Sequence, residues 1–273
     1  MASLSQSPEL PDGVVPPAAR PPRWPWWLPA LALLGTFAIA TFALLIGVAV
    51  TGKTKPTPAV NIAATFVQDG GLVLCAVLFA FLTRRPNAWQ FGLRPTRFWP
   101  AVGWLLVAWL GFFVFSALWS VFMHAVGVKL DDDLPQQLGA DKSTAALVAV
   151  AVLVCVVAPL AEEFFFRGFF FTALRGSLGL WPAAVITGIV FGLIHFKLEF
   201  LAPLAVLGFA LCLLYAQTGS LLPCIALHAL NNSLAFGVTQ GWTWQIPAIM
   251  VGSLVLLAAI LTPIVRRTAL AVA

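Results

Sequence analysis

The chain has 273 residues, of which 61% are hydrophobic and only 9% are charged. Its mean hydropathy is +0.97. Soluble domains carry roughly 25% charged residues, so this composition excludes an ordinary soluble domain and predicts an integral protein of the lipid bilayer. We attribute the formal net charge of +5 to basic loops, and we expect no nucleic-acid partner.

Residues 1–26 are rich in proline and polar side chains, and we expect them to form a disordered cytoplasmic tail. The apolar run that follows is longer than the roughly 7–15 residues of a signal-peptide core. We therefore expect it to be retained as the first helix of a membrane-embedded domain that comprises residues 27–273.

Apolar runs of about 20 residues, the length that crosses a bilayer as a helix, recur along this domain. No alternating ten-residue pattern indicates a barrel. The sequence thus predicts an all-α, polytopic membrane helix bundle with about eight transmembrane helices, at 27–50, 59–82, 99–127, 143–174, 180–196, 200–217, 220–236 and 246–265.

The distribution of basic residues predicts the orientation of the bundle, because cytoplasmic loops carry an excess of Lys and Arg. With the N-terminus inside, nine basic residues are cytoplasmic and five are not: Arg20, Arg23, Arg84, Arg85, Arg94, Arg97, Arg175, Arg266 and Arg267 against Lys53, Lys55, Lys129, Lys142 and Lys197. We expect both termini to be cytoplasmic and the acidic triplet 131–133 to face outward. The Ala-, Arg- and Pro-rich composition favours a bacterial inner membrane.

A few ionisable residues lie within the predicted spans, where each costs a few kcal/mol at the bilayer centre and is a functional candidate. They are Asp69, Glu162, Glu163, Arg167, His195 and His228, with His124 near a helix end. We assign Asp69 to a bond with a neighbouring helix or a water rather than to catalysis, because no second carboxylate motif accompanies it.

The two adjacent glutamates must have different roles, because neighbouring residues on a helix point about 100° apart. Glu163 precedes Arg167 by four residues, the favourable order for an ion pair on one face. Glu162 lacks such a partner, and burial makes an unpaired carboxylate a better proton acceptor, so it is the candidate general base.

Histidines and an asparagine complete the set of candidates. His195 follows Phe191 by one helical turn, and His228 and Asn232 share a helix face. The last two side chains could hold helices together or could donate to a developing oxyanion. The zinc-protease pattern HExxH, the serine pattern GxSxG and the aspartyl pattern GxGD are all missing. The four cysteines show no CxxC spacing.

Three patterns occur in order on successive apolar segments: EExxxR at 162–167, FxxxH at 191–195 and HxxxN at 228–232. Together they resemble the CPBP family of intramembrane endopeptidases, which includes CAAX prenyl proteases of the Rce1 type, bacteriocin-processing relatives and myxosortases. The motifs cover about 160–235, and we take about 143–236 as the core of the protease domain.

The resemblance implies a glutamate-type peptide hydrolase that uses no cofactor. Glu162 and His195 would activate the attacking water, Glu163 and Arg167 would orient the site or the substrate backbone, and His228 and Asn232 would form the oxyanion hole. A zinc enzyme is the alternative, with Glu162, His195 and His228 as the three protein ligands. The expected substrate is a protein or peptide with a membrane-associated C-terminal segment, processed in maturation or sorting.

Two other function classes could use the same kinds of residue. A transporter or proton relay could also use buried carboxylates and histidines, but such proteins usually contain internal repeats with broken helices, and none is visible in this sequence. A non-catalytic scaffold of the same fold would be expected to have lost a motif residue, and all of them are present.

Overall fold

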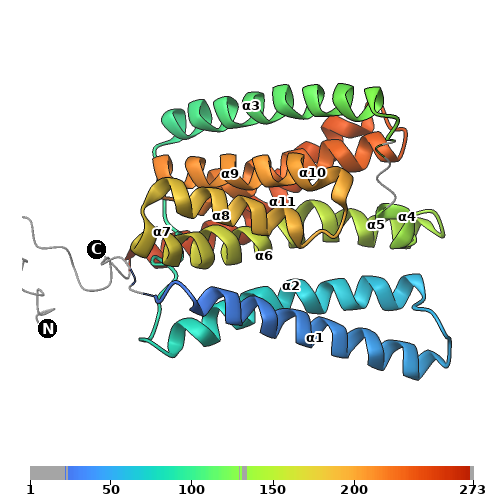
Figure 1. The fold of residues 1–273 in the computed structure, drawn as a ribbon, viewed down its shortest axis with the longest axis horizontal. Helices are drawn as coiled ribbons and strands as arrows, with labels where there is room; N and C mark the ends of the chain where they lie inside the picture. The colour runs from blue at the N-terminus through green and yellow to red at the C-terminus, as the bar shows by residue number, and fades with distance from the viewer. Residues whose placement is uncertain (1–21, 23, 129, 131–133, 271–273) are drawn as a thin grey trace, which may run out of the picture.

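The computed structural model describes residues 22, 24–128, 130 and 134–270. Every regular element in this part of the chain is a helix, which confirms the all-α bundle (Figure 1). Seven helices are long and apolar enough to cross a membrane, and an eighth apolar helix, Leu180–Leu193, is shorter. The predicted tail lies almost entirely outside the described residues, and so does the acidic triplet 131–133.

The helices follow the chain in this order: α1 (Leu28–Thr51), α2 (Pro58–Phe81), α3 (Phe98–Ala125), α4 (Leu134–Gln137), α5 (Thr144–Val152), η2 (Leu153–Val157), α6 (Ala158–Glu163), η3 (Phe164–Phe171), α7 (Thr172–Leu178), α8 (Leu180–Leu193), η4 (Leu198–Phe200), α9 (Leu201–Thr218), α10 (Leu221–Thr239) and α11 (Gln245–Leu270). Local signals set several boundaries. Thr57, Ser143 and Ser220 cap the starts of α2, α5 and α10 through their side-chain oxygens. Left-handed glycines end α1 and α9.

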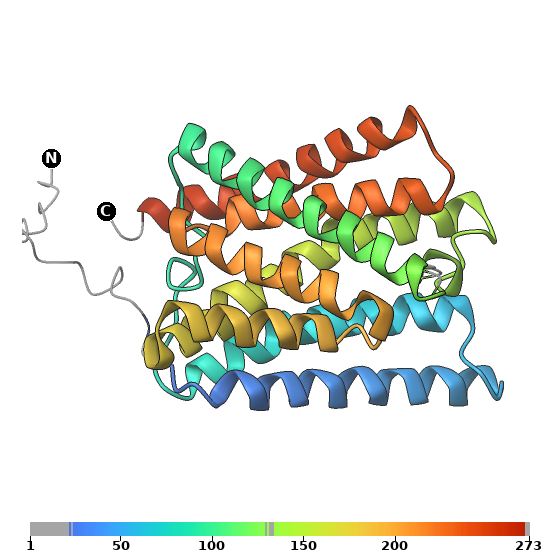
Figure 2. The same cartoon turned by 45° about the horizontal axis from the view of Figure 1, so that its top comes forward.

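The predicted span 143–174 is one long rod, Thr144–Leu178, that lies in the middle of the bundle (Figures 1 and 2). It packs against α2 on one side and α10 on the other. Two segments of this rod, η2 and η3, are π-helical, and the six residues of α6 lie between them. Short π segments inside α-helices occur frequently at functional sites. The sequence pattern did not predict them.

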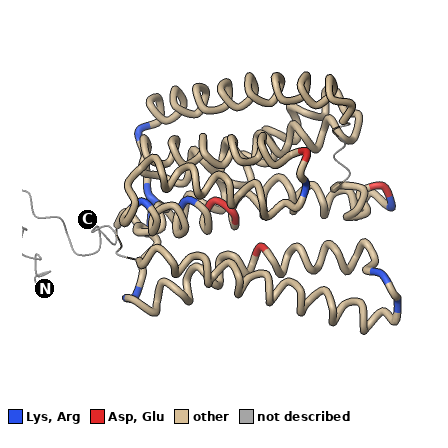
Figure 3. The backbone as a smooth tube through the Cα atoms, in the orientation of Figure 1, with Lys and Arg blue, Asp and Glu red and all other residues tan. Residues whose placement is uncertain are grey.

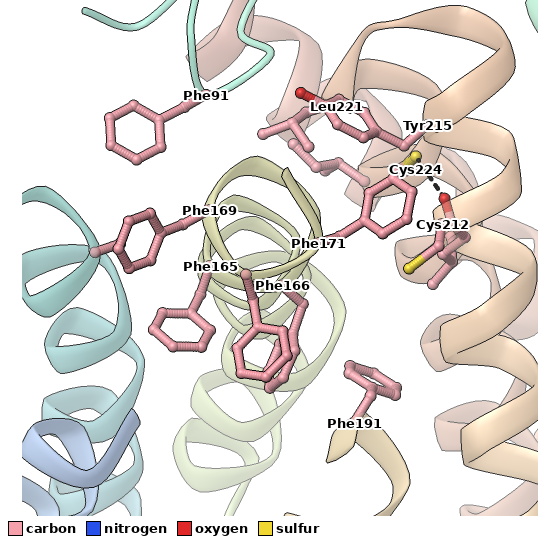
Figure 4. Packing of buried hydrophobic residues seen from close by; sticks show 14 of the residues in the cluster. Phe91, Phe165, Phe166, Phe169, Phe171, Phe191, Cys212, Tyr215, Leu221 and Cys224 are labelled. Atoms are coloured by element: carbon pink, nitrogen blue, oxygen red, sulfur yellow. Dashed lines mark hydrogen bonds between the residues drawn. The ribbon is translucent and has the colours of Figure 1, made fainter. Parts of the chain in front are cut away.

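Phenylalanine side chains pack around η3 and form the centre of the hydrophobic core (Figure 4). Phe165, Phe166, Phe169 and Phe171 are fully buried. Trp24 is also buried, and its ring lies edge-on to Phe169 at 5.0 Å. The packed core therefore already includes Trp24, which precedes α1.

The loop between α2 and α3 folds back onto the bundle and closes one of its ends. The Leu221 amide donates to the Gly92 carbonyl at 2.9 Å, and the Ser220 hydroxyl donates to the Arg94 carbonyl at 2.6 Å. The Phe91 ring stacks on Phe164 at 4.5 Å. These contacts join the loop to η3 and to the start of α10.

Charged positions lie mainly at the two ends of the bundle (Figure 3). The arginine-containing α2–α3 loop lies at the end where α1 begins and α11 terminates, and the basic α1–α2 turn lies at the other end. Helix α8 has 14 residues, about 21 Å, which is shorter than the roughly 30 Å hydrocarbon core. The turn that joins α8 to η4 and α9 stops short of the far end of the bundle in Figure 1.

Helices α8 and α9 pack closely because small residues face one another. A Cβ added at Gly188 would lie 2.5 Å from the Ala205 carbonyl oxygen and 2.9 Å from the Phe209 amide nitrogen. A Cβ at Gly208 would lie 2.9 Å from the Gly188 Cα. Backbones in membrane bundles approach this closely only where side chains are small.

We predict that Gly188→Val destabilises the protein by about 1–3 kcal/mol, the usual cost of overpacking, because the new side chain meets α9 backbone that cannot move away locally. Thermal unfolding in detergent measures the effect. Gly111→Val in α3, where an added Cβ meets no atom within 4 Å, is the matched control. Equal melting temperatures for the two variants would show that α8 and α9 do not pack as described.

Candidate active site

Glu163 lies at the centre of the site and joins two of the three motifs. Its side chain is fully buried, and its Oε1 accepts a hydrogen bond from Arg167 Nη1 at 2.8 Å. His228 Nδ1 lies 2.8 Å from the same oxygen. The ion pair expected from the four-residue spacing is therefore confirmed, and α10 contributes a second partner from 65 residues further along the chain.

Arg167 is also fully buried, and helices α8 and α9 surround its guanidinium. Its Nη2 donates to the Gly208 carbonyl at 3.3 Å, and its Cζ lies 4.6 Å from the centre of the Phe191 ring. The close approach of α8 and α9 thus positions both a carbonyl acceptor and an aromatic face for the cation. This explains how a guanidinium is accommodated among phenylalanines.

The bond to Glu163 sets the orientation of the His228 ring. A carboxylate paired with arginine only accepts hydrogen bonds, so Nδ1 carries the proton of the imidazole. Nε2 then faces Glu162, whose Oε2 lies 3.9 Å away. That separation is longer than a direct hydrogen bond and suits a group or a water placed between them.

Glu162 has the environment that its position next to Glu163 predicted. Its side chain is 14% exposed, against 0% for Glu163. Its Oε2 is buried and has no hydrogen-bond partner within the described structure, which is also true of Glu163 Oε2. Only Glu163 has partners on its other oxygen, Oε1. One glutamate is therefore fixed by two partners, and the other is left available for chemistry.

His195 lies just beyond the C-terminal end of α8. Its Nδ1 is 2.7 Å from the Phe191 carbonyl oxygen, which can only accept, so Nδ1 donates. The Phe191 ring contacts both imidazoles, with its centroid 5.1 Å from that of His195 and 5.7 Å from that of His228. His228 therefore lies next to Glu162, and His195 contacts the same phenylalanine ring as His228.

Asn232 has a contact that the sequence did not predict. Its Nδ2 donates to the Val154 carbonyl at 3.0 Å, in the π-helical segment η2. The spacing of His228 and Asn232 predicted two groups aimed at one acceptor, but one hydrogen of the carboxamide is already committed to the rod. The second hydrogen remains for another acceptor.

The remaining candidates lie in different places. Asp69 is buried on α2, which packs against α6. His124 is exposed in the last turn of α3. All four cysteines are buried and unpaired.

Whether zinc fits this site depends on whether enough side chains that could bind it lie close together. No three His, Cys, Asp or Glu side chains converge as metal ligands would in the parts of the chain that the structure describes. His228 directs Nδ1 at Glu163 and only Nε2 towards Glu162. The alternative set Glu162, His195 and His228 is therefore not assembled as a zinc site in the described structure.

Reasoning from the sequence missed the contributions of backbone groups and of Phe191. The Gly208 and Val154 carbonyls accept from Arg167 and Asn232, and Phe191 contacts Arg167 and both histidines. Of these groups, only Phe191 could have been identified from the sequence, because it is the first residue of the FxxxH pattern. Every residue has a backbone carbonyl, so no sequence pattern identifies the carbonyls that accept these bonds.

We predict that Glu163→Ala destabilises the protein by about 3–5 kcal/mol, because it leaves the buried Arg167 charge unpaired. The double variant Glu163→Ala/Arg167→Met should regain part of the loss, since the unpaired charge is removed. Reversible unfolding of the two variants and of Arg167→Met gives the coupling energy. The same series at the exposed pair Asp141–Lys142 should change nothing measurable, and a double variant as unstable as Glu163→Ala would show that Glu163 and Arg167 do not interact.

Comparison with known proteins supports the family resemblance over the central part of the chain. Residues 144–234 match the family described as type II CAAX prenyl endopeptidase, Rce1-like. A Bacillus subtilis (strain 168) protein described as "Putative membrane peptidase YdiL" is 30% identical over 88 residues, which are 32% of this chain and 36% of that protein. The chain thus matches about a third of this curated relative. No solved structure matches.

Proposed function

We propose that this protein is an intramembrane endopeptidase of the CPBP type in which Glu162 activates a water for attack on a peptide bond. The observation that carries the proposal is the unequal treatment of the two glutamates. Arg167 and His228 both bond to Glu163 Oε1, whereas Glu162 Oε2 lies 3.9 Å from His228 Nε2, too far for a direct hydrogen bond. The match to a family of endopeptidases over 144–234 supports the same reading.

The proposed reaction begins with general-base catalysis. The Glu162 carboxylate accepts a proton from water, and His195 Nε2 accepts the second hydrogen bond of that water. The resulting hydroxide adds to the carbonyl carbon of the scissile bond. Protonated Glu162 then returns the proton to the nitrogen that leaves as the C–N bond breaks.

Donors for the developing oxyanion come from α10. The second carboxamide hydrogen of Asn232 is available, and the imidazolium form of His228 donates through Nε2 while Glu163 stabilises its charge. Such donors contribute about 3–4 kcal/mol each in comparable sites. The buried Glu163–Arg167 pair keeps the His228 ring in place and itself takes no part in proton transfer.

The proposed setting is a bacterial inner membrane with both chain ends in the cytoplasm. The arginine-rich α2–α3 loop lies at the end of the bundle where α1 begins and α11 terminates, and an excess of arginine favours a cytoplasmic position for this end. The proposed substrate is a protein or peptide whose C-terminal segment is membrane-associated, cleaved during maturation or sorting. Comparing membrane-protein C-termini between a deletion strain and its parent would identify it.

We predict that Glu162→Gln folds normally and loses cleavage by at least about 100-fold, as expected when a general base is removed. The measurement is processing of the identified substrate by purified protein in lipid. Glu199→Gln, which changes a glutamate in η4 outside the site, should leave the rate unchanged. Near-native turnover by Glu162→Gln would refute the assignment.

Metal dependence gives a separate prediction. Because no three donors converge in the described structure, we expect strong chelators to leave cleavage intact, and we expect elemental analysis to find far less than one zinc per chain. Loss of activity that zinc alone restores would instead favour the zinc set Glu162, His195 and His228.

A further inference from the structure

Pro159 lies inside the central rod and has no part in the proposed reaction. It is buried at the start of α6, shortly after the π-helical segment η2. Proline has no backbone N–H, and in a regular α-helix its ring would clash with the carbonyl four residues earlier, here that of Cys155. Membrane helices tolerate a proline where local π geometry and neighbouring helices satisfy the backbone groups that it frees.

The carbonyl that Pro159 leaves without a donor is that of Val154. The Ala158 amide donates to the Leu153 carbonyl, five residues earlier, which is the π-helical pattern. In the same pattern the Val154 carbonyl would accept from residue 159, which is the proline. Its α-helical donor would be the Ala158 amide, which bonds to Leu153 instead. Neither helical donor therefore serves the Val154 carbonyl.

Asn232 supplies the missing donor from another helix. Its Nδ2 donates to the Val154 carbonyl at 3.0 Å. Four residues earlier, on the same face of α10, His228 Nδ1 lies 2.8 Å from Glu163 Oε1. Helix α10 packs against both η2 and α6. Two bonds from one of its faces thus join α10 to two points of the rod, and together they restrict both sliding and rotation.

The other π-helical segment is bonded differently. The Thr172 hydroxyl donates to the Arg167 carbonyl of η3 at 2.8 Å. There the side-chain donor belongs to the rod itself, whereas the donor at η2 belongs to α10. The bond at η2 therefore couples the shape of the rod to the position of a second helix.

We propose that Pro159 and Asn232 act together as positioning residues. Pro159 removes the amide that would pair with the Val154 carbonyl, and Asn232 bonds to that carbonyl and so sets the position of α10. His228, one turn earlier, is thereby brought to Glu163. One carboxamide hydrogen of Asn232 serves this bond, and the other remains for the oxyanion. The consequence for cleavage rests on the proposed function, but the bond between the helices does not.

Solid-state NMR of the full-length protein in lipid bilayers tests the proposal without a substrate. Val154–Cys155 is the one place in the sequence where cysteine follows valine. Valine labelled with carbon-13 at its carbonyl and cysteine labelled with nitrogen-15 therefore select the Val154 carbonyl alone. Asn232→Leu should move this resonance upfield, because the carbonyl loses its donor.

Asn231→Leu is the matched control for this measurement. Asn231 is a half-buried asparagine at the adjacent position of α10, and its side chain projects about 100° away from that of Asn232. Its replacement should leave the Val154 resonance unchanged. A resonance that Asn232→Leu also leaves unchanged would overturn the bond between the helices.

Pro159→Ala tests the part played by the proline, because it returns an amide at residue 159. The Val154 carbonyl should then keep a donor, and Asn232→Leu should shift its resonance far less than in the wild type. Asn232→Leu should raise the unfolding constant about tenfold in the wild type, as expected for a buried acceptor left unsatisfied, and less than about threefold in the Pro159→Ala background. Equal effects in the two backgrounds would overturn the role of Pro159.

The His228 ring reports whether the bond positions α10. Its Nδ1 proton should move upfield in Asn232→Leu, because the bond to Glu163 weakens, and should not move in Asn231→Leu. An unmoved His228 proton in Asn232→Leu would overturn the positioning role.

Cleavage by Glu162→Gln separates this inference from the proposed function. If Glu162→Gln abolishes cleavage while Asn232→Leu leaves both resonances unmoved, the proposed function stands and this inference fails. If both resonances move as expected but Glu162→Gln cleaves normally, the reverse holds.

Discussion

The structure depends on how four neighbouring ionisable side chains, Glu162, Glu163, Arg167 and His228, are accommodated in an apolar bundle. An isolated charge at membrane depth is costly, and an ion pair recovers that cost only when its other hydrogen-bonding atoms are satisfied. Here Glu163 pairs with Arg167, and further partners come from His228 and the Gly208 carbonyl. Glu163 Oε2 and Arg167 Nε have no hydrogen-bond partner within the described structure, so the cost is recovered only in part. The close packing of α8 on α9 and the position of α10 beside the central rod therefore both serve one buried cluster.

Within this cluster, the two adjacent glutamates have different roles: Glu163 is structural, and Glu162 is the proposed general base. Glu163 is fixed by its partners, and its neighbour Glu162 projects in another direction, towards His228 Nε2. The π-helical segments η2 and η3 lie on either side of α6, and Asn232 donates to the Val154 carbonyl in η2.

Much of this could be predicted from the sequence, and the reasons differ by feature. Apolar runs predict helices directly, and the spacing of Glu163 and Arg167 predicts their pair, because both depend on local geometry. The bonds from His228 to Glu163 and from Asn232 to Val154 join residues 65 and 78 positions apart. Contacts between residues so far apart cannot be read from local spacing in a single sequence. The sequence also predicted a short apolar segment at 180–196, where α8 spans Leu180–Leu193. The π segments depend on packing, which periodicity does not report.

The central claim is that Glu163 fixes His228 so that Nε2 faces Glu162. Nitrogen NMR of the selectively labelled His228 ring in lipid bilayers tests it most directly, because the spectrum distinguishes a protonated ring nitrogen from an unprotonated one. The account predicts that Nδ1 carries a proton in every titration state of the ring. A neutral ring with its proton on Nε2 and a bare Nδ1 would contradict it.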